Sequence, residues 1–131
     1  MMKNFRSLAV AILIGSGILT ALGCGEDKKA QLINGVIYAD RALDGVTANP
    51  LSEASYRGMI ANGQTPVDYV KATLPKSEPV FDNYVYNQPP KPWTIVIRPT
   101  NDPNEYAIEG YADSTKMPVK VEYSTVNLPE E

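Results

Sequence analysis

Residues 93–126, WTIVIRPTNDPNEYAIEGYADSTKMPVKVEYSTV, contain three short segments in which polar and apolar residues alternate. The segments span residues 93–99, 105–112 and 119–126, and all are rich in Val, Ile or Tyr. A period of two with β-branched and aromatic side chains predicts β-strands. Between them, PTNDPNE and DSTKMP supply the Pro, Asn, Asp and Ser residues that form turns. The pattern predicts an antiparallel β-meander with one face packed on other elements.

Upstream of these strands, three segments carry helix signals, at residues 26–45, 49–63 and 65–75. The first places apolar residues at helical spacing and meets a glycine at its end. The other two each begin with a capping residue followed by proline at the first helical position. Helices followed by strands predict an α+β fold, with short N-proximal helices before a 3–4-stranded antiparallel β-meander.

A possible partner surface lies in and after the first predicted strand, VFDNYVYN at 80–87. Its two later tyrosines point to one face, where they either pack in the core or contact a partner, since tyrosine is enriched at interfaces. The following stretch NQPPKPW, at 87–93, cannot be a central strand because proline donates no hydrogen bond. It is either a stiff connection or a polyproline II surface with a PxxP spacing. The candidate surface consists of Tyr84, Tyr86, Pro89, Pro92 and Trp93.

The N-terminal 23 residues have the pattern of a secretory signal peptide. Lys3 and Arg6 precede an uncharged run from Leu8 to Gly23, which ends in small residues. The run is shorter than the roughly 20 apolar residues that a transmembrane helix needs, although such a helix is the alternative. We therefore expect a signal peptide at 1–23 that is cleaved before Cys24.

The motif ALGC at 21–24 resembles the lipobox of bacterial lipoproteins, with Ala21 and Leu22 in the reverse of the usual order. The resemblance implies a lipid on Cys24, followed by a short tether over 24–27. The length and the helix and strand patterns predict a single small α+β domain at 28–131. The same residues also suit the ordinary signal peptidase. Because Cys24 is the one cysteine of the chain, it is lipidated, joined to a partner by a disulfide, or a free thiol.

The resemblance to bacterial lipoproteins also predicts where the protein is located. It implies an exported, membrane-anchored protein that faces the periplasm or the cell surface. Gly25 follows the cysteine, which by the same resemblance favours the outer over the inner membrane.

Composition argues against several functions. The chain has no histidine, so the usual nucleophile–base pairs are missing, and we expect no enzyme activity and no cofactor or metal. Asp102, Asn104 and Glu105 supply oxygen atoms in one loop, with Asp113 in the next. A calcium site is the alternative, but such residues are far more often turn formers. Without residues 1–23, the chain has 10 basic and 15 acidic residues, and this negative net charge argues against nucleic-acid binding.

Two functions fit this pattern. The first is a non-catalytic envelope lipoprotein that binds a protein partner or scaffolds an assembly. The alternative is a companion subunit of an extracellular filament or secretion system. For the latter, a helix followed by an antiparallel meander over residues 28–126 loosely resembles the globular head of type IV pilins and pseudopilins. The chain lacks the leader and the hydrophobic helix start of that family.

Overall fold

The chain divides into two compact units, Met1–Ala30 and Gln31–Glu131. The structure is a computed structural model that describes residues 20–114 and 116–129, with side chains from Asp27 onward. Most of the predicted signal peptide therefore lies outside the described residues. Within the part that is described, no helix is both long enough and apolar enough to cross a membrane.

The helices follow the capping signals of the sequence. They are α1 (Thr20–Asp44), the 3₁₀ turn η1 (Gly45–Thr47), α2 (Pro50–Ala61) and α3 (Pro66–Thr73). The Asn49 side chain accepts a hydrogen bond from the Ser52 backbone N–H at 2.9 Å, which caps α2. Thr65 and Asp68 form the predicted capping box of α3. The three predicted helices are thus confirmed, and α1 begins upstream of the predicted residue 26.

Four strands form one sheet in the order β1-β2-β3-β4. Their bounds are β1 Tyr84–Tyr86, β2 Thr94–Pro99, β3 Glu105–Tyr111 and β4 Lys120–Thr125. The pairs β2–β3 and β3–β4 are antiparallel, as predicted. The pair β1–β2 is parallel, so the predicted antiparallel meander holds for three strands and is wrong for the first. The expected strand at 80–87 is also shortened, because Phe81–Asn83 forms the 3₁₀ turn η2.

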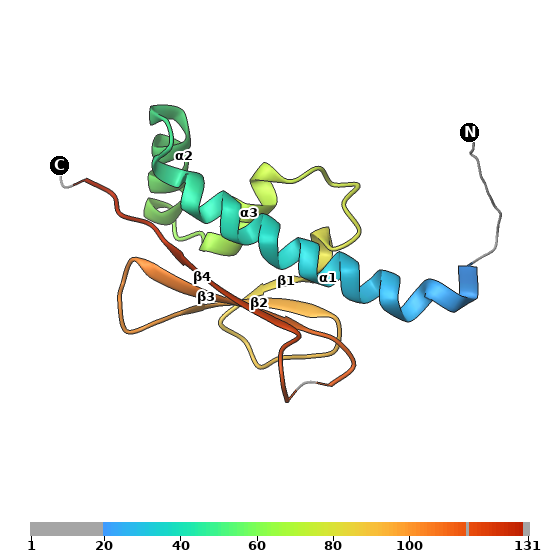
Figure 1. Cartoon of the computed structure of the whole chain (residues 1–131). Helices are drawn as coiled ribbons and strands as arrows, with labels where there is room; N and C mark the ends of the chain where they lie inside the picture. Colours follow the sequence, from blue (N-terminus) through green and yellow to red (C-terminus); the bar gives the residue numbers. More distant parts are fainter. Residues whose placement is uncertain (1–19, 115, 130–131) are drawn as a thin grey trace. The chain divides into compact units, whose positions relative to one another are not determined.

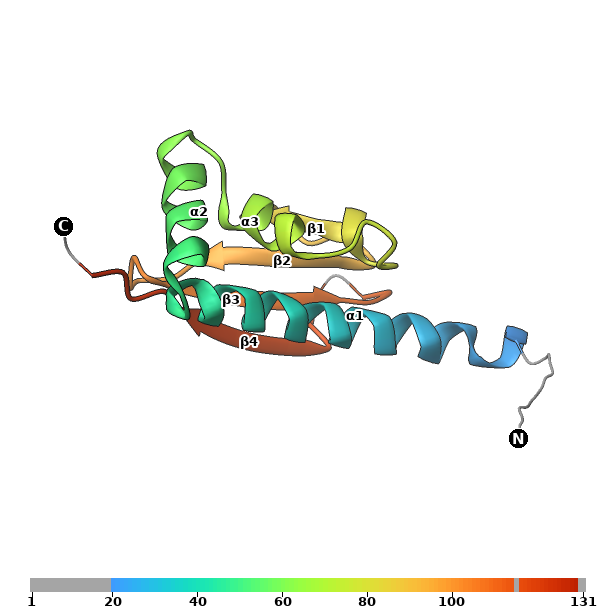
Figure 2. The same cartoon turned by 90° about the horizontal axis from the view of Figure 1, so that it is seen from above.

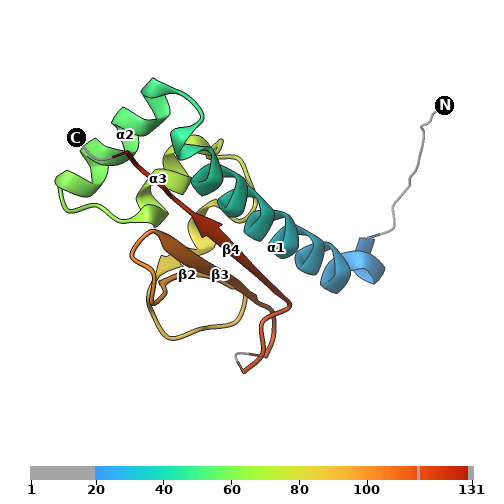
Figure 3. The same ribbon diagram turned by 60° about the vertical axis from the view of Figure 1, so that its left-hand side comes forward.

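The proline-rich connection explains the parallel pair. Parallel neighbours need a crossover that returns the chain along the whole strand, for which a dozen or more residues are usual. Here the seven residues Asn87–Trp93 make the connection, and an extended chain of this length can span roughly 20 Å, about the length of β2. Figures 1 and 3 show this connection crossing the face of the sheet away from the helices. NQPPKPW is therefore a connection between two strands, as predicted, and not a central strand.

The core of the second unit lies between α1 and the sheet. Helices α1, α2 and α3 lie on the same side of the sheet (Figures 1 and 2). The inner residues of α1 are spaced by three or four and are fully or nearly fully buried: Leu32, Val36, Ala39 and Leu43. They pack with buried residues of the central strands: Ile95, Ile97 and Ile108. This periodicity is the apolar stripe expected of a helix that covers a sheet.

Two glycines let α1 approach the sheet closely. A Cβ atom at Gly35 would lie 2.5 Å from Ile95 Cδ1 and 2.8 Å from Val80 Cγ2. On the sheet side, a Cβ atom at Gly110 would lie 2.9 Å from Val36 Cγ2. Each glycine therefore leaves the space that a side chain from the opposite layer occupies.

The polar residues of β4, not its apolar ones, face α1. Glu122 is the register partner of the buried Ile108, and paired residues share a face. Ser124 is fully buried and donates its hydroxyl to Asp40 Oδ1 at 2.6 Å and to the Asp40 carbonyl oxygen at 2.9 Å. This contact ties the C-terminal half of α1 to the edge strand.

Asp40→Asn is expected to stabilise the fold at neutral pH. Burial raises the pKa of Asp40, and repulsion from Asp44 and Glu122 adds to the effect, although the Ser124 hydrogen bond opposes it. A raised folded-state pKa means that the charged form costs stability above that pKa, and that this cost vanishes as the pH falls through it. The gain should be less than about 1 kcal/mol at pH 7, because Asp40 is half-exposed, and should vanish near pH 4. Urea unfolding at pH 7 and pH 4 measures it; an equal gain at both values would contradict the electrostatic explanation.

Candidate functional site

The sheet face away from α1 carries both a buried layer and an exposed one. Strand alternation places Val96, Ala107 and Tyr111 on this face. All three are buried, and the crossing segment Asn87–Trp93 lies on their side of the sheet (Figure 1). The connection therefore lies over part of this outer face.

A polar cluster follows on the same face. Arg98 Nε donates to Glu109 Oε1 at 2.7 Å, and the Tyr111 hydroxyl donates to the same oxygen at 2.9 Å. The hydrogen bond and charge of Glu109 raise the pKa of Arg98. Burial, followed by the contact with Glu109, raises the pKa of Tyr111. Since the carboxylate is occupied by two donors of its own sheet, the cluster is a fixed surface feature and not a free acid or base.

Beyond this cluster, the outer face becomes apolar and exposed. Four large apolar side chains within residues 117–123 are exposed by 39 % or more, and we call them the β4 patch: Met117, Val119, Val121 and Tyr123. Val121 and Tyr123 belong to β4 itself and lie on the face opposite Glu122. Single exposed apolar residues are ordinary, but several in one short segment indicate a contact surface.

The residues of the sequence-predicted surface are not all exposed. Tyr84 is 4 % exposed and donates its hydroxyl to the Gly35 carbonyl oxygen at 2.6 Å, so it is a core residue and cannot contact a partner. Tyr86 and Trp93 are half-buried and pack against the core. Pro89 and Pro92 are exposed in the connection. Only the two prolines are therefore fully available as a surface.

Trp93 ends the connection in an uncommon backbone conformation, with φ of 63°. Asn87, at the other end, has φ of 50°, which asparagine adopts more readily than tryptophan. The strain at Trp93 is held by two hydrogen bonds. Its N–H donates to the Ala112 carbonyl at 3.2 Å, and its own carbonyl accepts from Asn83 Nδ2 at 2.8 Å. The tryptophan thus anchors the turn into β2.

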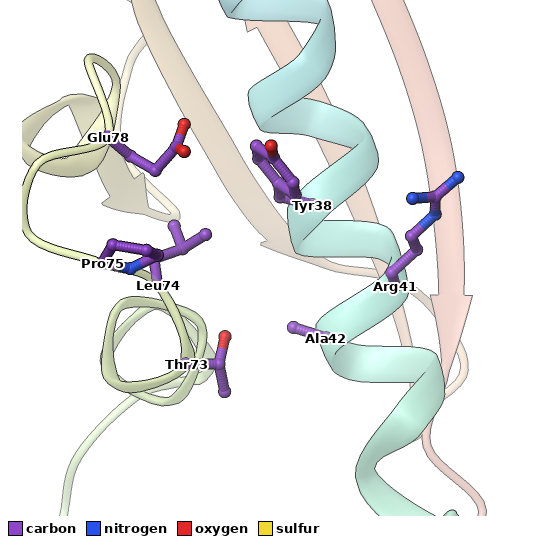
Figure 4. A pocket seen from close by; sticks show the side chains of 7 residues that line it. All are labelled: Tyr38, Arg41, Ala42, Thr73, Leu74, Pro75 and Glu78. Carbon is purple, nitrogen blue, oxygen red and sulfur yellow. The ribbon is translucent and has the colours of Figure 1, made fainter.

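A groove of about 450 Å³ lies between α1 and the C-terminal end of α3 with the segment that follows it. The lining residues come from these two walls: Tyr38, Arg41, Ala42, Thr73, Leu74, Pro75 and Glu78. Figure 4 shows the Glu78 carboxylate toward Tyr38, whereas the Arg41 guanidinium extends on the opposite side of α1. The Thr73 hydroxyl is bonded to the Val70 carbonyl at 2.7 Å. The polar groups do not converge on a common point, so the groove has no arrangement suited to acid–base chemistry.

Cys24 lies in the N-terminal part of α1, and its side chain is outside the description. The loop acids act as turn formers, since Asp102 Oδ1 accepts the Asn104 backbone N–H at 2.8 Å. Within residues 20–114 and 116–129, no three His, Cys, Asp or Glu residues group closely enough to hold a metal ion.

The chain was compared with protein-family models, curated proteins and solved structures, and none of them matches it. The candidate surface therefore rests on the geometry of the chain itself.

Sequence reasoning missed the β4 patch because alternation shows that a strand has two faces but does not tell which face is buried. A signal was present in Ser124. It continues the polar set of Lys120 and Glu122, and Asp40 supplies a carboxylate partner for it on α1.

Proposed function

We propose that the chain is a non-catalytic binding or scaffold protein of the bacterial cell envelope, anchored through a lipid on Cys24. The β4 patch carries the binding part of this proposal, because it exposes four apolar side chains on an otherwise well-packed domain. The location is exported and membrane-attached, with the outer membrane favoured by Gly25. The expected partner is a protein of the cell envelope.

The short distance in sequence between anchor and domain supports a local role. Only six residues separate Cys24 from Gln31, the first residue of the second compact unit. Attachment to a membrane raises the effective concentration of a domain for partners in the same membrane. Moderate affinity at the β4 patch is then enough for binding.

The anchor is tested by the intact mass of the chain extracted from membranes of a bacterial host. We expect the mass of residues 24–131 plus acyl groups, and expect Cys24→Ser to lose those groups and leave the detergent phase. The bare mass of 24–131 would indicate a free thiol, and a retained leader would indicate a membrane helix. Either of these two outcomes contradicts the lipid anchor.

The binding surface is tested with Val121→Asp in the full chain. A charge in an apolar contact that buries a valine should weaken binding at least about tenfold, since that burial contributes about 1.5–3 kcal/mol. In-cell cross-linking followed by mass spectrometry measures the adducts. Leu51→Asp is the matched control, because Leu51 is 84 % exposed on α2, away from the patch. Equal adducts in both variants and the wild type would remove the β4 patch as the binding surface.

A pilin-head-like companion subunit is the second candidate. The observation that favours it is the close packing of α1 on the strands through Gly35 and Gly110. Recovery of the chain in sheared extracellular filaments supports this candidate, and its absence from such preparations argues against it.

A further inference from the structure

We infer that the partner of the β4 edge is a second copy of this chain, paired antiparallel through β4 with its two-fold axis at Val121. The inference rests on the proposed function, because it names the occupant of the same surface. It follows from three observations on the edge strand: its open side, its charge pattern and the adjoining flank of α1.

Among the described residues, no strand pairs with the open side of β4. β4 is the last strand of the sheet and pairs only with β3 among the described strands. Val126 donates its N–H to the Asn104 carbonyl in register with the ladder. Because backbone groups alternate along a strand, those of Val121 and Tyr123 point to the open edge. An exposed edge with apolar side chains is a template for pairing with another strand.

The charge pattern selects the register. With the axis at Val121, Lys120 lies opposite Glu122 of the second copy and Glu122 opposite its Lys120, while Val121 lies opposite Val121. The two neighbouring symmetric registers place Lys120 opposite Lys120 or Glu122 opposite Glu122. Like charges directly opposite each other destabilise a strand pair, whereas opposite charges stabilise it. The edge is therefore self-complementary in one register, as a two-fold interface requires.

In a single chain, Lys120 Nζ and Glu122 Oε2 are already 3.1 Å apart, and both side chains are about one-third exposed. The two groups therefore have little distance to move to form the pairs across the axis. On the outer face, the same register brings the exposed Tyr123 to the level of the exposed Val119 of the second copy. Charged contacts thus lie on one face and apolar contacts on the other.

The adjoining flank of α1 enlarges the contact. The Ser124 contact shows that Asp40 is on the side of α1 that faces β4. Ile33 and Ile37 precede it by seven and three residues, so they share this flank, and both are half-buried. A two-fold axis perpendicular to the sheet brings the same flank of the second copy to the same side. Stable interfaces bury about 1,200–2,000 Å² in total, which a pair of edge strands alone does not reach.

Disulfide trapping tests the register directly. Val121→Cys in the full chain, oxidised mildly in membranes of the host, should yield a covalent dimer joined through residues 121 and 121. Mass spectrometry of the cross-linked peptide separates this product from any that involves Cys24. Leu51→Cys, equally placed on an exposed surface, is the control for random collision. We expect at least fivefold more dimer from Val121→Cys; an equal yield would overturn the inference.

Charge reversal supplies the second test, with Val121→Cys as the reporter. Lys120→Glu and Glu122→Lys should each lower the trapped dimer at least fivefold, because each places like charges opposite each other. The double reversal should restore it to within twofold of the parent. Thermal unfolding of each variant checks that the fold is kept. Failure of the double reversal to recover the dimer would overturn the register.

These results are distinguishable from those of the proposed function. If Val121→Asp removes cross-links to a different envelope protein while Val121→Cys traps no dimer, the binding function stands and the self-association fails. If neither result is obtained, both fail.

Discussion

Gly35→Val is expected to lower the free energy of unfolding by about 3 kcal/mol, since overpacking a tight core costs about 1–3 kcal/mol and sometimes more. The added Cβ would lie 2.5 Å from Ile95 Cδ1, 2.8 Å from Val80 Cγ2 and 3.3 Å from the Tyr84 hydroxyl. The end of the Ile95 side chain can rotate away. Val80 is β-branched and stiff, and the Tyr84 hydroxyl is held by its bond to the Gly35 carbonyl, so these two cannot. We expect α1 to move off the sheet.

Gly58→Ala is the matched control for this prediction. Gly58 is also inside a helix, α2, but a Cβ atom there would meet nothing within 4 Å. The free energy of unfolding of Gly58→Ala should therefore rise by about 1 kcal/mol, because alanine has a higher helix propensity than glycine. Gly35→Ala should lose stability, but less than Gly35→Val, because the same propensity offsets part of the clash. Thermal unfolding followed by circular dichroism measures all three, with a fall in Tm of more than roughly 12 °C expected for Gly35→Val. A stabilised Gly35→Ala would contradict the close approach of α1 and β2.

The second large effect is a loss of stability at alkaline pH caused by two buried tyrosines, Tyr56 and Tyr84. Burial raises the pKa of both hydroxyls well above the usual value near 10. For Tyr56 the hydrogen bond with Tyr106, at 3.1 Å, adds to the rise. For Tyr84 the charge of Glu78 adds to it. Both rings are about 5 % exposed, so their ionisation requires unfolding or a large rearrangement.

The sign follows from proton linkage. Above pH 10 the unfolded chain releases these protons and the folded chain keeps them, so stability is complete below pH 10 and falls as the pH rises toward the folded-state pKa. Each tyrosine contributes a slope of about 1.4 kcal/mol per pH unit, and the pair lowers stability by about 4 kcal/mol at pH 11.5.

The measurement is urea unfolding from pH 8 to pH 11.5 for the wild type and single phenylalanine variants. Tyr84→Phe should lose about 1–2 kcal/mol at pH 8, because the Gly35 carbonyl loses its donor, and this deficit should shrink or reverse by pH 11.5. Tyr56→Phe should lower the slope of stability against pH above pH 10 by the contribution of one tyrosine, about 1.4 kcal/mol per pH unit. Tyr123→Phe, which removes an exposed tyrosine, is the control. Parallel curves for all four proteins would contradict the linkage.

Local signals were sufficient for most of the fold. The capping residues Asn49 and Thr65 start α2 and α3 as predicted, because a cap satisfies backbone groups within a few residues of itself. The alternation of polar and apolar residues predicted β2, β3 and β4, because this pattern too lies within one short segment. Strand β1 was different. Its direction depends on the path of Asn87–Trp93 across the sheet, and a short connection favours a hairpin unless proline keeps it extended.

The candidate site was predicted less well than the fold. Tyr84 was placed in a possible partner surface, but its hydroxyl is bonded to α1 inside the core. The β4 patch was not singled out, although Val121 and Tyr123 were predicted to alternate with charged neighbours. Which face of a strand is buried depends on residues far away in the sequence, and the Asp40–Ser124 contact joins positions 84 residues apart.

The sequence by itself determined the helices, three of the four strands, and the expectation of a lipid anchor at Cys24, since each depends on residues within one short segment. Only the tertiary structure decided the parallel β1, the burial of Tyr84 and the outward direction of the β4 patch. The burial of Tyr84 and the outward direction of the β4 patch depend on the packing of α1 on the sheet, which Gly35 and Gly110 permit by leaving room for side chains of the opposite layer. The direction of β1 depends on the path of Asn87–Trp93. Close packing couples residues that are distant along the chain, and no local pattern contains that information.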